Sequence, residues 1–397
     1  MRVAVIGAGI LGLAAARTIA ATEPDAELTV FDKEPEIARH QTSHNSGVLH
    51  AGLYYKPGSL KARLCRRGVE LMRAYCDEHA IAVEECGKVL VATDEVELGR
   101  LDDLLERSEA NGVPGVRRLS ESELRAVEPH VSGLGGIHSP STAILDFGAV
   151  ARHLADEVRE RGGSLRLGAE VTEIRDEPAG CRISLADGSV RTADRVLVCA
   201  GLYADRLARR SGRSGDPRII PFRGEYYALR RGREDLVRGL IYPVPDPSLP
   251  FLGVHLTRKV GGSVLVGPNA VLALAREGYR NTTVNARDLA EILAWSGMRR
   301  VALAHWRVGV AEVARSLSRR MFVREARRYV PELAADDVEP APAGVRAQAV
   351  AASGALVDDF VLDSERHVVW VRNAPSPAAT SSLAIAEELV ERLGLTG

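Results

Sequence analysis

The hydrophobic pattern of the first thirty residues predicts a strand, a helix and a second strand in close succession. Residues 2–6 form an apolar run that is typical of a strand buried on both faces of a parallel sheet. An amphipathic pattern continues to about residue 21 and predicts a helix, and residues 28–31 predict the second buried strand. Units of this kind build the parallel sheets of α/β proteins.

The rest of the chain alternates between similar strands and longer helical stretches. Helices are predicted over residues 59–79, 94–110, 120–128, 146–161, 285–329 and 378–393. Strands are predicted over residues 87–92, 169–174 and 194–201 and within 217–266, and hairpins over 183–190, with an Asp-Gly turn, and over 357–373. We therefore expect an α/β fold (α+β overall), with a Rossmann-like nucleotide-binding domain interrupted by a mixed-sheet substrate-binding domain. The first is assigned residues 1–84, 146–216 and 340–397, and the second residues 85–145 and 217–339.

The turn between the first strand and helix carries glycines at the spacing that binds a dinucleotide. Gly7 allows the tight turn, Gly9 lets the backbone approach a pyrophosphate, and Gly12 lets the helix pack on the strand. The helix N-terminus supplies N–H donors and positive potential to the phosphates. Asp32, which ends the second strand, can accept hydrogen bonds from a ribose diol and disfavours a 2′-phosphate. FAD or NAD is therefore expected rather than NADP.

A polar loop follows the second strand. Residues 40–55, His-Gln-Thr-Ser-His-Asn-Ser-Gly-Val-Leu-His-Ala-Gly-Leu-Tyr-Tyr, would be costly in a core, because each buried polar atom needs a partner. The run suits a large polar cofactor, with His50 held close to the reacting atoms. A solvated polar loop is the alternative interpretation.

Two later segments also suit a cofactor site. Residues 373–382 are small and hydroxyl-bearing, so a planar ring could lie over this turn at the start of the last predicted helix, whose N-terminus would stabilise negative charge on a reduced flavin. An ordinary capped helix is the alternative. Ala200 and Gly201 end a buried strand and allow close backbone approach to the cofactor.

Arg346, just after Gly344, could grip a carboxylate through a bidentate pair, although a lone arginine after a turn is usually a surface residue.

Composition and charge restrict the class of protein. The length of 397 residues suggests two or three domains, and the net charge of −1 gives no reason to expect a nucleic acid partner. No apolar run is long enough to span a membrane, and no signal peptide is expected because a strand begins at once, so the predicted location is cytoplasmic. Arginine pairs such as Arg299-Arg300 and Arg319-Arg320 predict solvated helix faces. The alternative is a basic surface that contacts anionic lipid at the inner face of the membrane. The five cysteines have no CxxC spacing, so reduced thiols and no metal site are expected.

The run from His40 to Cys65 closely resembles the L-2-hydroxyglutarate dehydrogenases (also called oxidases), which belong to the wider D-amino-acid-oxidase-like flavoprotein superfamily. The resemblance spans nearly the whole chain and continues through residues 199–206, 216–224, 241–246, 250–255, 267–273, 276–279, 342–348, 357–360 and 373–382. One departure is Ser43, where family members usually have Gly. The resemblance implies FAD, oxidation of L-2-hydroxyglutarate to 2-oxoglutarate with hydride transfer to flavin N5, and passage of electrons to quinone, another acceptor or dioxygen.

Chemistry and resemblance together suggest roles for particular residues. Oxidation of a 2-hydroxy acid needs a hydride acceptor, a base for the hydroxyl proton and a clamp for the carboxylate. An imidazole titrates near neutral pH, so His50 is the favoured base and His255 the reserve. Arg346 matches the superfamily position that holds the α-carboxylate, and the candidates for the distal carboxylate are Tyr55, Tyr242 and Lys61. The expected cofactor contacts are Gly7, Gly9, Ile10, Leu11, Gly12, Asp32, Lys33, Thr42, Ser43, Asn45, Ser46, Gly47, Val48, Val171, Ala200, Gly201, Gly344, Arg346, Ala379, Thr380 and Ser381.

Two rival functions stay open at the level of sequence. One is an FAD-dependent oxidase of another 2-hydroxy acid or of an amino acid on the same scaffold. The other is a non-catalytic FAD-binding assembly protein, against which the presence of His50, His255 and Arg346 argues. The sequence makes no prediction of the oligomeric state.

Overall fold

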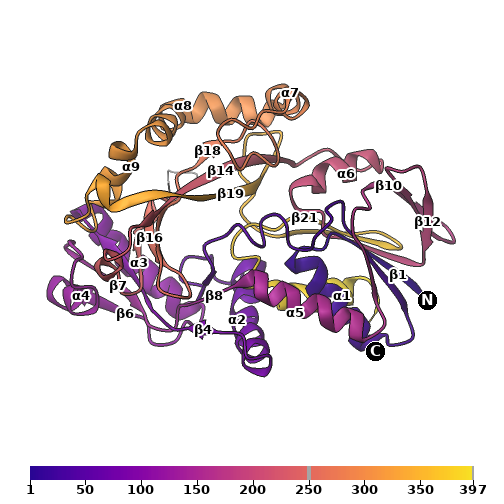
Figure 1. Cartoon of the computed structure of the whole chain (residues 1–397), viewed down its shortest axis with the longest axis horizontal. Coiled ribbons are helices and arrows are strands. Elements are labelled where there is room, and N and C mark those ends of the chain that lie inside the picture. The colour runs from indigo at the N-terminus through magenta and orange to yellow at the C-terminus, as the bar shows by residue number, and fades with distance from the viewer. Residues whose placement is uncertain (248–251, 396–397) are drawn as a thin grey trace.

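The structure is a computed structural model that describes residues 1–247 and 252–395. Residues 250 and 251 of the family-like block 250–255 lie outside the described residues, as do residues 396 and 397 of the last predicted domain segment. The chain forms two lobes, each built around its own large sheet, and both chain ends lie in the same lobe (Figure 1).

The first lobe contains a six-stranded sheet whose strands come from three separate parts of the chain. Its order is β20-β21-β13-β1-β2-β9, and only β20 runs antiparallel to its neighbour. The strands are β1 (Arg2–Ile6), β2 (Glu27–Phe31), β9 (Ser164–Arg166), β13 (Arg195–Val198), β20 (Val361–Ser364) and β21 (Val368–Asn373). This sheet is the Rossmann-like core predicted from the opening pattern.

Both faces of that sheet are covered, which explains the apolar run in its first strand. Val3 and Val5 face a core formed with the helices α1 (Ile10–Thr22), α2 (Leu60–Glu78), α5 (Phe147–Glu160) and α10 (Ser382–Arg392). Ala4 and Ile6 face the opposite core. That core includes α6 (Ala204–Arg210) and a three-stranded meander of β10 (Val171–Glu177), β11 (Gly180–Leu185) and β12 (Val190–Ala193). Alternate residues of one strand are therefore buried on both sides.

The second lobe is built on a nine-stranded mixed sheet. Its path is β18-β14-β17-β16-β15-β5-β7-β6, with β19 paired to β14. The strands are β5 (Lys88–Ala92), β6 (Arg117–Ser120), β7 (Gly135–Ser139), β14 (Arg218–Leu229), β15 (Leu240–Pro243), β16 (His255–Arg258), β17 (Val264–Gly267), β18 (Val271–Leu272) and β19 (Val338–Val350). Its helices are α3 (Glu95–Ala110), α4 (Glu121–Val127), α7 (Ala286–Ala294), α8 (Ser296–Leu317) and α9 (Arg319–Ala326). The last three lie along the outside of this lobe (Figure 1).

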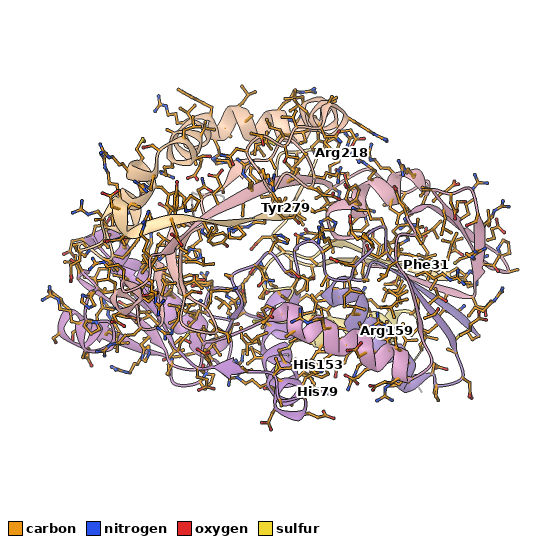
Figure 2. All side chains as sticks on the ribbon, in the orientation of Figure 1. Phe31, His79, His153, Arg159, Arg218 and Tyr279 are labelled. Carbon is orange, nitrogen blue, oxygen red and sulfur yellow. The ribbon has the colours of Figure 1, made fainter. Side chains whose placement is uncertain are left out.

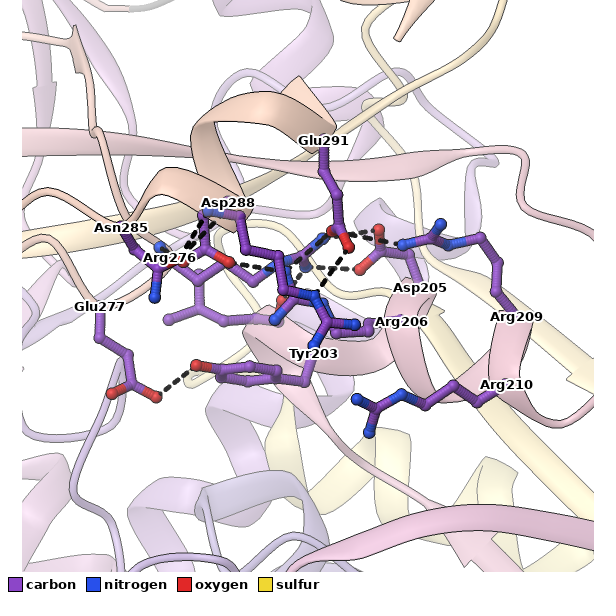
Figure 3. A network of polar contacts seen from close by, with 12 residues as sticks. Tyr203, Asp205, Arg206, Arg209, Arg210, Arg276, Glu277, Asn285, Asp288 and Glu291 are labelled. Carbon is purple, nitrogen blue, oxygen red and sulfur yellow. Dashed lines mark hydrogen bonds and ion pairs between the residues drawn. The ribbon is translucent and has the colours of Figure 1, made fainter. Parts of the chain in front are cut away.

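A small sheet and a charged network connect the lobes. The small sheet pairs β8 (Ala143–Leu145) with β3 (Val48–Leu49) and β4 (Val83–Glu84). In the network, shown in Figure 3, Arg276 donates to both carboxylate oxygens of Asp205 at 2.6 and 2.9 Å. Arg206 donates to Asp288 at 2.6 Å. These groups tie α6 of the first lobe to the segment that leads into α7.

Most predicted elements are present, and three predictions need correction. The segment 285–329 forms three helices, because the chain leaves helical geometry at Trp295 and Ser318. The last helix begins at Ser382 and not at residue 378, because residues 376–381 form a run of turns. The predicted boundary at residue 340 falls inside β19, which stays paired to β14 as far as Val350. None of the helices among the described residues is both long and apolar enough to cross a membrane.

Candidate functional site

Two adjoining cavities lie where the first sheet meets the polar loop and the turn before α10. The larger has a volume of about 270 Å³ and the smaller about 140 Å³. Both are lined by Gly9, Gln41, Thr42, Cys199 and Gly201, so they form one elongated space. The described residues thus offer a site with two compartments that meet at the glycine turn.

The glycine turn leaves no room for side chains at two of its three glycines. A Cβ atom on Gly7 would lie 2.3 Å from the carbonyl oxygen of Cys199, and one on Gly12 would lie 1.9 Å from the carbonyl oxygen of Gly7. Gly7 also has a φ of +111°, which L side chains rarely adopt. The space beside Gly9 is part of both cavities. The turn is therefore packed against β13 on one side and open to a ligand on the other.

The start of α1 and the end of β2 present the groups that a dinucleotide needs. The backbone at Leu11 and Gly12 lines the larger cavity, where the first turn of a helix attracts phosphate. Asp32 lines the smaller cavity and is fixed by the backbone N–H groups of Ala8 (2.6 Å) and Glu34 (2.9 Å). Its oxygens retain lone pairs for further donors such as ribose hydroxyls. The shape and donor set of this space fit a dinucleotide.

The other predicted cofactor residues divide between the two cavities. Those in the larger cavity are Gly9, Ile10, Leu11, Gly12, Thr42, Asn45, Ser46, Val48, Gly201, Gly344, Arg346, Ala379 and Thr380. Those in the smaller cavity are Gly7, Gly9, Asp32, Lys33, Thr42, Val171, Ala200 and Gly201. Ser43, Gly47 and Ser381 line neither cavity. Ser43 is exposed and its hydroxyl donates to the carbonyl of Ala38 at 2.8 Å, so the hydroxyl that departs from the family pattern is bonded within the loop.

Local hydrogen bonds give the polar loop its shape. The amide of Asn45 donates to the carbonyl oxygens of Gln41 (3.1 Å) and Thr42 (2.6 Å), while its oxygen accepts from the N–H of Gly47. The hydroxyl of Thr42 accepts from the N–H of Ile10 at 3.0 Å and so joins the loop to the first helix. Polar residues that could be taken for a solvent-exposed loop in the sequence therefore form the hydrogen bonds that hold this loop against the cavity.

His50 lies at the far end of this loop, against the turn before α10. Its backbone N–H donates to the hydroxyl of Thr380 at 3.1 Å, and that hydroxyl donates to the carbonyl of Val48 at 3.3 Å. The Nε2 atom of His50 lies 3.5 Å from the hydroxyl of Ser376, and its Nδ1 atom is buried without a partner among the described residues. Burial, together with the charge of Lys88, holds the pKa of His50 well below its usual range. The imidazole is therefore neutral at pH 7 and able to accept a proton.

His255 is placed by the second sheet. It begins β16 and stacks on the ring of Tyr242, with centroids 3.9 Å apart. Its Nδ1 atom lies 2.9 Å from the carbonyl of Gly253, which assigns the proton of the neutral ring to Nδ1 and leaves Nε2 as an acceptor. Burial lowers the pKa of His255 to about 3. Neither His255 nor Tyr242 lines the two cavities. Burial raises the pKa of the Tyr242 hydroxyl, and this is partly opposed by its hydrogen bonds with Thr257 and with Ser46, which lines the larger cavity.

Arg346 reaches the larger cavity from β19, opposite Phe222 of β14. The Arg346 side chain lies deep within the protein, but it projects into the cavity and is therefore accessible to solvent there. Gly344, two residues earlier, passes so close to the loop that a Cβ atom would lie 2.5 Å from the carbonyl oxygen of His44. His50 and Arg346, predicted as base and carboxylate clamp, thus line one cavity with the glycine turn.

Besides Tyr242, the two other candidates for the distal carboxylate, Lys61 and Tyr55, do not line this cavity. Lys61 donates its ammonium to the carbonyl and carboxylate oxygens of Asp358, both at 2.7 Å. Tyr55 lies beside Lys61, whose ammonium is 5.2 Å from the centre of the tyrosine ring. Neither residue lines the cavities. Lys61 therefore joins α2 to the segment before β20.

Sequence reasoning missed several residues of the site. Gln41, His44, Tyr226 and Ser376 line the larger cavity, and Tyr279, labelled in Figure 2, covers His44 with ring centroids 4.4 Å apart. Lys88 is also missed, although it is buried beside Tyr54 and Tyr242. The available signal was a lysine in an otherwise apolar strand, Lys-Val-Leu-Val-Ala.

Comparison with known proteins agrees with a flavin site. The family described as FAD dependent oxidoreductase (DAO) matches residues 2–392. The chain is 45% identical to the mitochondrial L-2-hydroxyglutarate dehydrogenase of Nematostella vectensis, over 98% of this chain and 90% of that protein. It is 44% identical to the L-2-hydroxyglutarate dehydrogenase of Escherichia coli, over 98% and 92%. The dithionite-reduced L-alpha-glycerophosphate oxidase from Mycoplasma pneumoniae with FAD bound has a TM-score of 0.81 at 21% identity, over 99% of this chain and 94% of that one, and shares the fold.

Proposed function

Because the chain belongs to the family of FAD dependent oxidoreductases, and within it to the L-2-hydroxyglutarate dehydrogenases, we propose that it oxidises L-2-hydroxyglutarate to 2-oxoglutarate. The observation that carries the proposal is the meeting of His50, Arg346 and the glycine turn in one cavity. The turn suits a dinucleotide, the histidine suits a proton acceptor, and the arginine suits a carboxylate.

The cavities fit FAD through features of the backbone and of single side chains. The first turn of α1 would hold the pyrophosphate, Asp32 the ribose, and the turn before α10 with Thr380 would lie along the flavin. Bound FAD supplies the acceptor for the hydride that leaves the carbinol carbon of the substrate.

The side chains of this protein provide the remaining chemistry. His50 takes the hydroxyl proton, because burial keeps its imidazole neutral and its Nε2 atom lies toward Ser376 at the cavity wall. Arg346 presents a planar guanidinium that can hold the carboxylate next to the reacting carbon through two parallel hydrogen bonds. Holding the substrate in one orientation brings the carbinol into register with the base.

A surface on α8 supports a proposal for the electron acceptor. Five apolar side chains of α8 are exposed by 51–80%: Leu303, which precedes a kink at His305, and Trp306, Val310, Val313 and Leu317, which follow it at a spacing of three or four residues. Exposed arginines stand around this apolar stripe: Arg299, Arg300 and Arg307 on α8, and Arg319, Arg320 and Arg324 on α9. Apolar and cationic groups arranged in this way suit an interface with anionic lipid. We therefore propose peripheral membrane contact through α8 and a lipid-soluble quinone as the acceptor.

Anaerobic reduction of the flavin tests the proposed reaction. L-2-hydroxyglutarate should bleach the flavin absorbance far faster than D-2-hydroxyglutarate, L-lactate or a panel of amino acids. Lactate lacks the distal carboxylate, so a polar pocket built for that group stays unpaired. Equal rates with lactate would assign a general 2-hydroxy acid oxidase, faster bleaching by an amino acid would assign an amino-acid oxidase, and no bleaching would favour a non-catalytic protein.

A further inference from the structure

Lys88 is a buried cation without a carboxylate partner among the described residues. It is 2% exposed and begins β5. Its ammonium donates to the hydroxyl of Tyr54 at 3.1 Å and lies 4.4 Å from the centre of the Tyr242 ring. Burying an ammonium without a counter-ion is costly, and removing its charge or supplying an anion relieves that cost. The surroundings of Lys88 therefore suit a ligand that brings negative charge.

The pairing of strands places Lys88 with the residues of the site. Lys88 pairs with Leu240 of β15, and Leu240 pairs with Thr257 of β16, so these side chains and that of His255 project from one face of the sheet. Tyr242, beneath the ammonium, is also the residue that stacks on His255. The charge of Lys88 acts on both His50 and His255. Lys88, which like His255 and Tyr242 lies behind the lining of the two cavities, thus belongs to the same cluster as the proposed base.

We propose that Lys88 binds the distal carboxylate of a dicarboxylic 2-hydroxy acid, while Arg346 holds the carboxylate next to the reacting carbon. This assignment rests on the proposed function. The hydroxyl of Tyr54 accepts from Lys88 and can donate its own proton to the same carboxylate. Two cations on separate strands match the two negative charges of the substrate. Lys61 is less suited, because its ammonium is already held by Asp358.

Proton linkage follows from the surroundings of this lysine. Burial lowers the pKa of Lys88 to about 7, opposed by the nearby thiols of Cys65 and Cys86. The histidines and tyrosines of the cluster are uncharged near pH 7, since burial lowers the pKa of both histidines and raises those of the three tyrosines Tyr54, Tyr55 and Tyr242. Lys61 and Arg346 are further cations nearby, and they act on His50 and His255 respectively. A bound carboxylate favours the charged amine, so binding of the diacid takes up a proton.

The first test compares two substrates that differ only at the distal end. Lys88→Met keeps the length and apolar stem of the side chain and removes its charge. It should lower kcat/KM for L-2-hydroxyglutarate by roughly 30- to 1000-fold, mainly through KM, because the distal carboxylate is left without its cation. The value for L-2-hydroxypentanoate, which carries a methyl group in place of that carboxylate, should be nearly unchanged. Lys56→Met is the matched control, because Lys56 is an exposed lysine in the segment that precedes α2.

The melting temperature of the variant and its relative activity on the two acids distinguish a ligand of the distal carboxylate from a residue with a structural role. Lys88→Met should preserve or raise the melting temperature of the FAD-loaded protein, because a buried unpaired charge is removed. Loss of activity on both acids to the same extent, with a shifted pH profile, would make Lys88 a residue that only tunes the histidines. Unchanged discrimination between the acids would overturn the assignment. A wild-type enzyme that does not oxidise L-2-hydroxyglutarate at all would instead overturn the proposed function.

A second test uses the unmodified protein and does not depend on the folding of a variant. The Kd of 2-oxoglutarate for the oxidised holoenzyme, read from the shift of the flavin spectrum, should rise about tenfold per pH unit above pH 7 as Lys88 loses its proton. The Kd of 2-oxopentanoate should not follow this slope. Parallel pH profiles for the two acids would contradict the proposal.

Discussion

The hydroxyl of Thr380 holds the backbone N–H of His50, although 330 residues separate them in the chain. The same hydroxyl donates to the carbonyl of Val48, so one side chain fixes the end of the polar loop against the turn before α10. The position of the proposed base therefore depends on a residue near the C-terminal end of the chain.

Removing that hydroxyl should displace the base. Thr380→Val keeps the shape of the side chain but leaves the N–H of His50 unpaired, and we expect flavin reduction to slow by roughly 10- to 100-fold through misorientation. Rapid-reaction absorbance of the flavin measures this step. Thr22→Val is the control, because Thr22 is exposed at the end of α1 and bonds only within its own helix. Reduction at the wild-type rate in Thr380→Val would show that the bond does not position His50.

His50→Ala should remove the base itself. The rate of flavin reduction should fall by roughly 10²- to 10⁴-fold while FAD content stays nearly unchanged. In the wild type, the rate should stay level as the pH falls through 6.5, because burial keeps the pKa of His50 below that value, and decline only at lower pH. His153→Ala, at an exposed position on α5 (Figure 2), is the control. A near-normal rate in His50→Ala would transfer the role to His255.

His255 should make the protein sensitive to acid. Its pKa is lowered to about 3 in the folded state, so below about pH 6.5 the unfolded chain binds a proton that the folded chain does not. Stability is therefore lost as the pH falls from 6.5 towards 3, and at pH 4.5 this group costs about 2–3 kcal/mol. His255→Asn should flatten the dependence of the unfolding free energy on pH, measured by urea titration, relative to His153→Asn. An unchanged slope would show that His255 takes up its proton in the folded state.

Asp32→Ala should weaken FAD binding by about 1–3 kcal/mol, because a charged acceptor for the ribose is lost. The substitution also removes two hydrogen bonds that hold the site together, since the carboxylate accepts from the backbone N–H groups of Ala8 and Glu34. Asp32→Asn, which retains one acceptor oxygen, should show a smaller loss. Titration of the apoprotein with FAD gives the Kd, with exposed Asp25→Ala as the control. Tight binding of NAD in place of FAD would contradict the proposed chemistry.

The apolar stripe of α8 should bind anionic vesicles. Replacing Leu303 and Trp306 with Glu should abolish co-sedimentation with vesicles that contain phosphatidylglycerol, while activity with a soluble dye acceptor stays unchanged. High salt should weaken the binding, because the surrounding arginines act electrostatically. Val96→Glu is the matched control, since Val96 is 64% exposed on α3. Wild-type protein that stays in the supernatant with such vesicles would exclude this surface as a lipid contact.

Local features of the site could be predicted from the sequence because they depend on neighbouring residues. Gly7, Gly9 and Gly12 act within one turn, and Asp32 follows from the length of a single strand–helix–strand unit. The turn before α10 was less predictable. Its hydroxyls look like helix caps, yet that of Thr380 is used by a distant loop, and the helix begins two residues later.

Residues whose surroundings come from several segments could not be predicted. Lys88 is buried because strands from residues 240–243 and 135–139 lie beside β5, and nothing next to it in the chain signals this. Lys61 follows the polar loop closely in sequence, but α2 directs it toward Asp358. The closeness of Lys61 to the polar loop in sequence therefore does not place its side chain at the cavity.

The order of strands in the first sheet has a consequence for synthesis of the protein. β1 emerges first from the ribosome, but its neighbour β13 follows about 190 residues later, and β21 completes the parallel run only near residue 370. Arg346 and Thr380, which line the cavity, are also made late. A nascent chain therefore leaves the edge of β13 without its parallel partner until β21 has been made, and the wall of the cavity stays incomplete until Arg346 and Thr380 are in place. We therefore expect FAD to bind tightly only after almost the whole chain has been made.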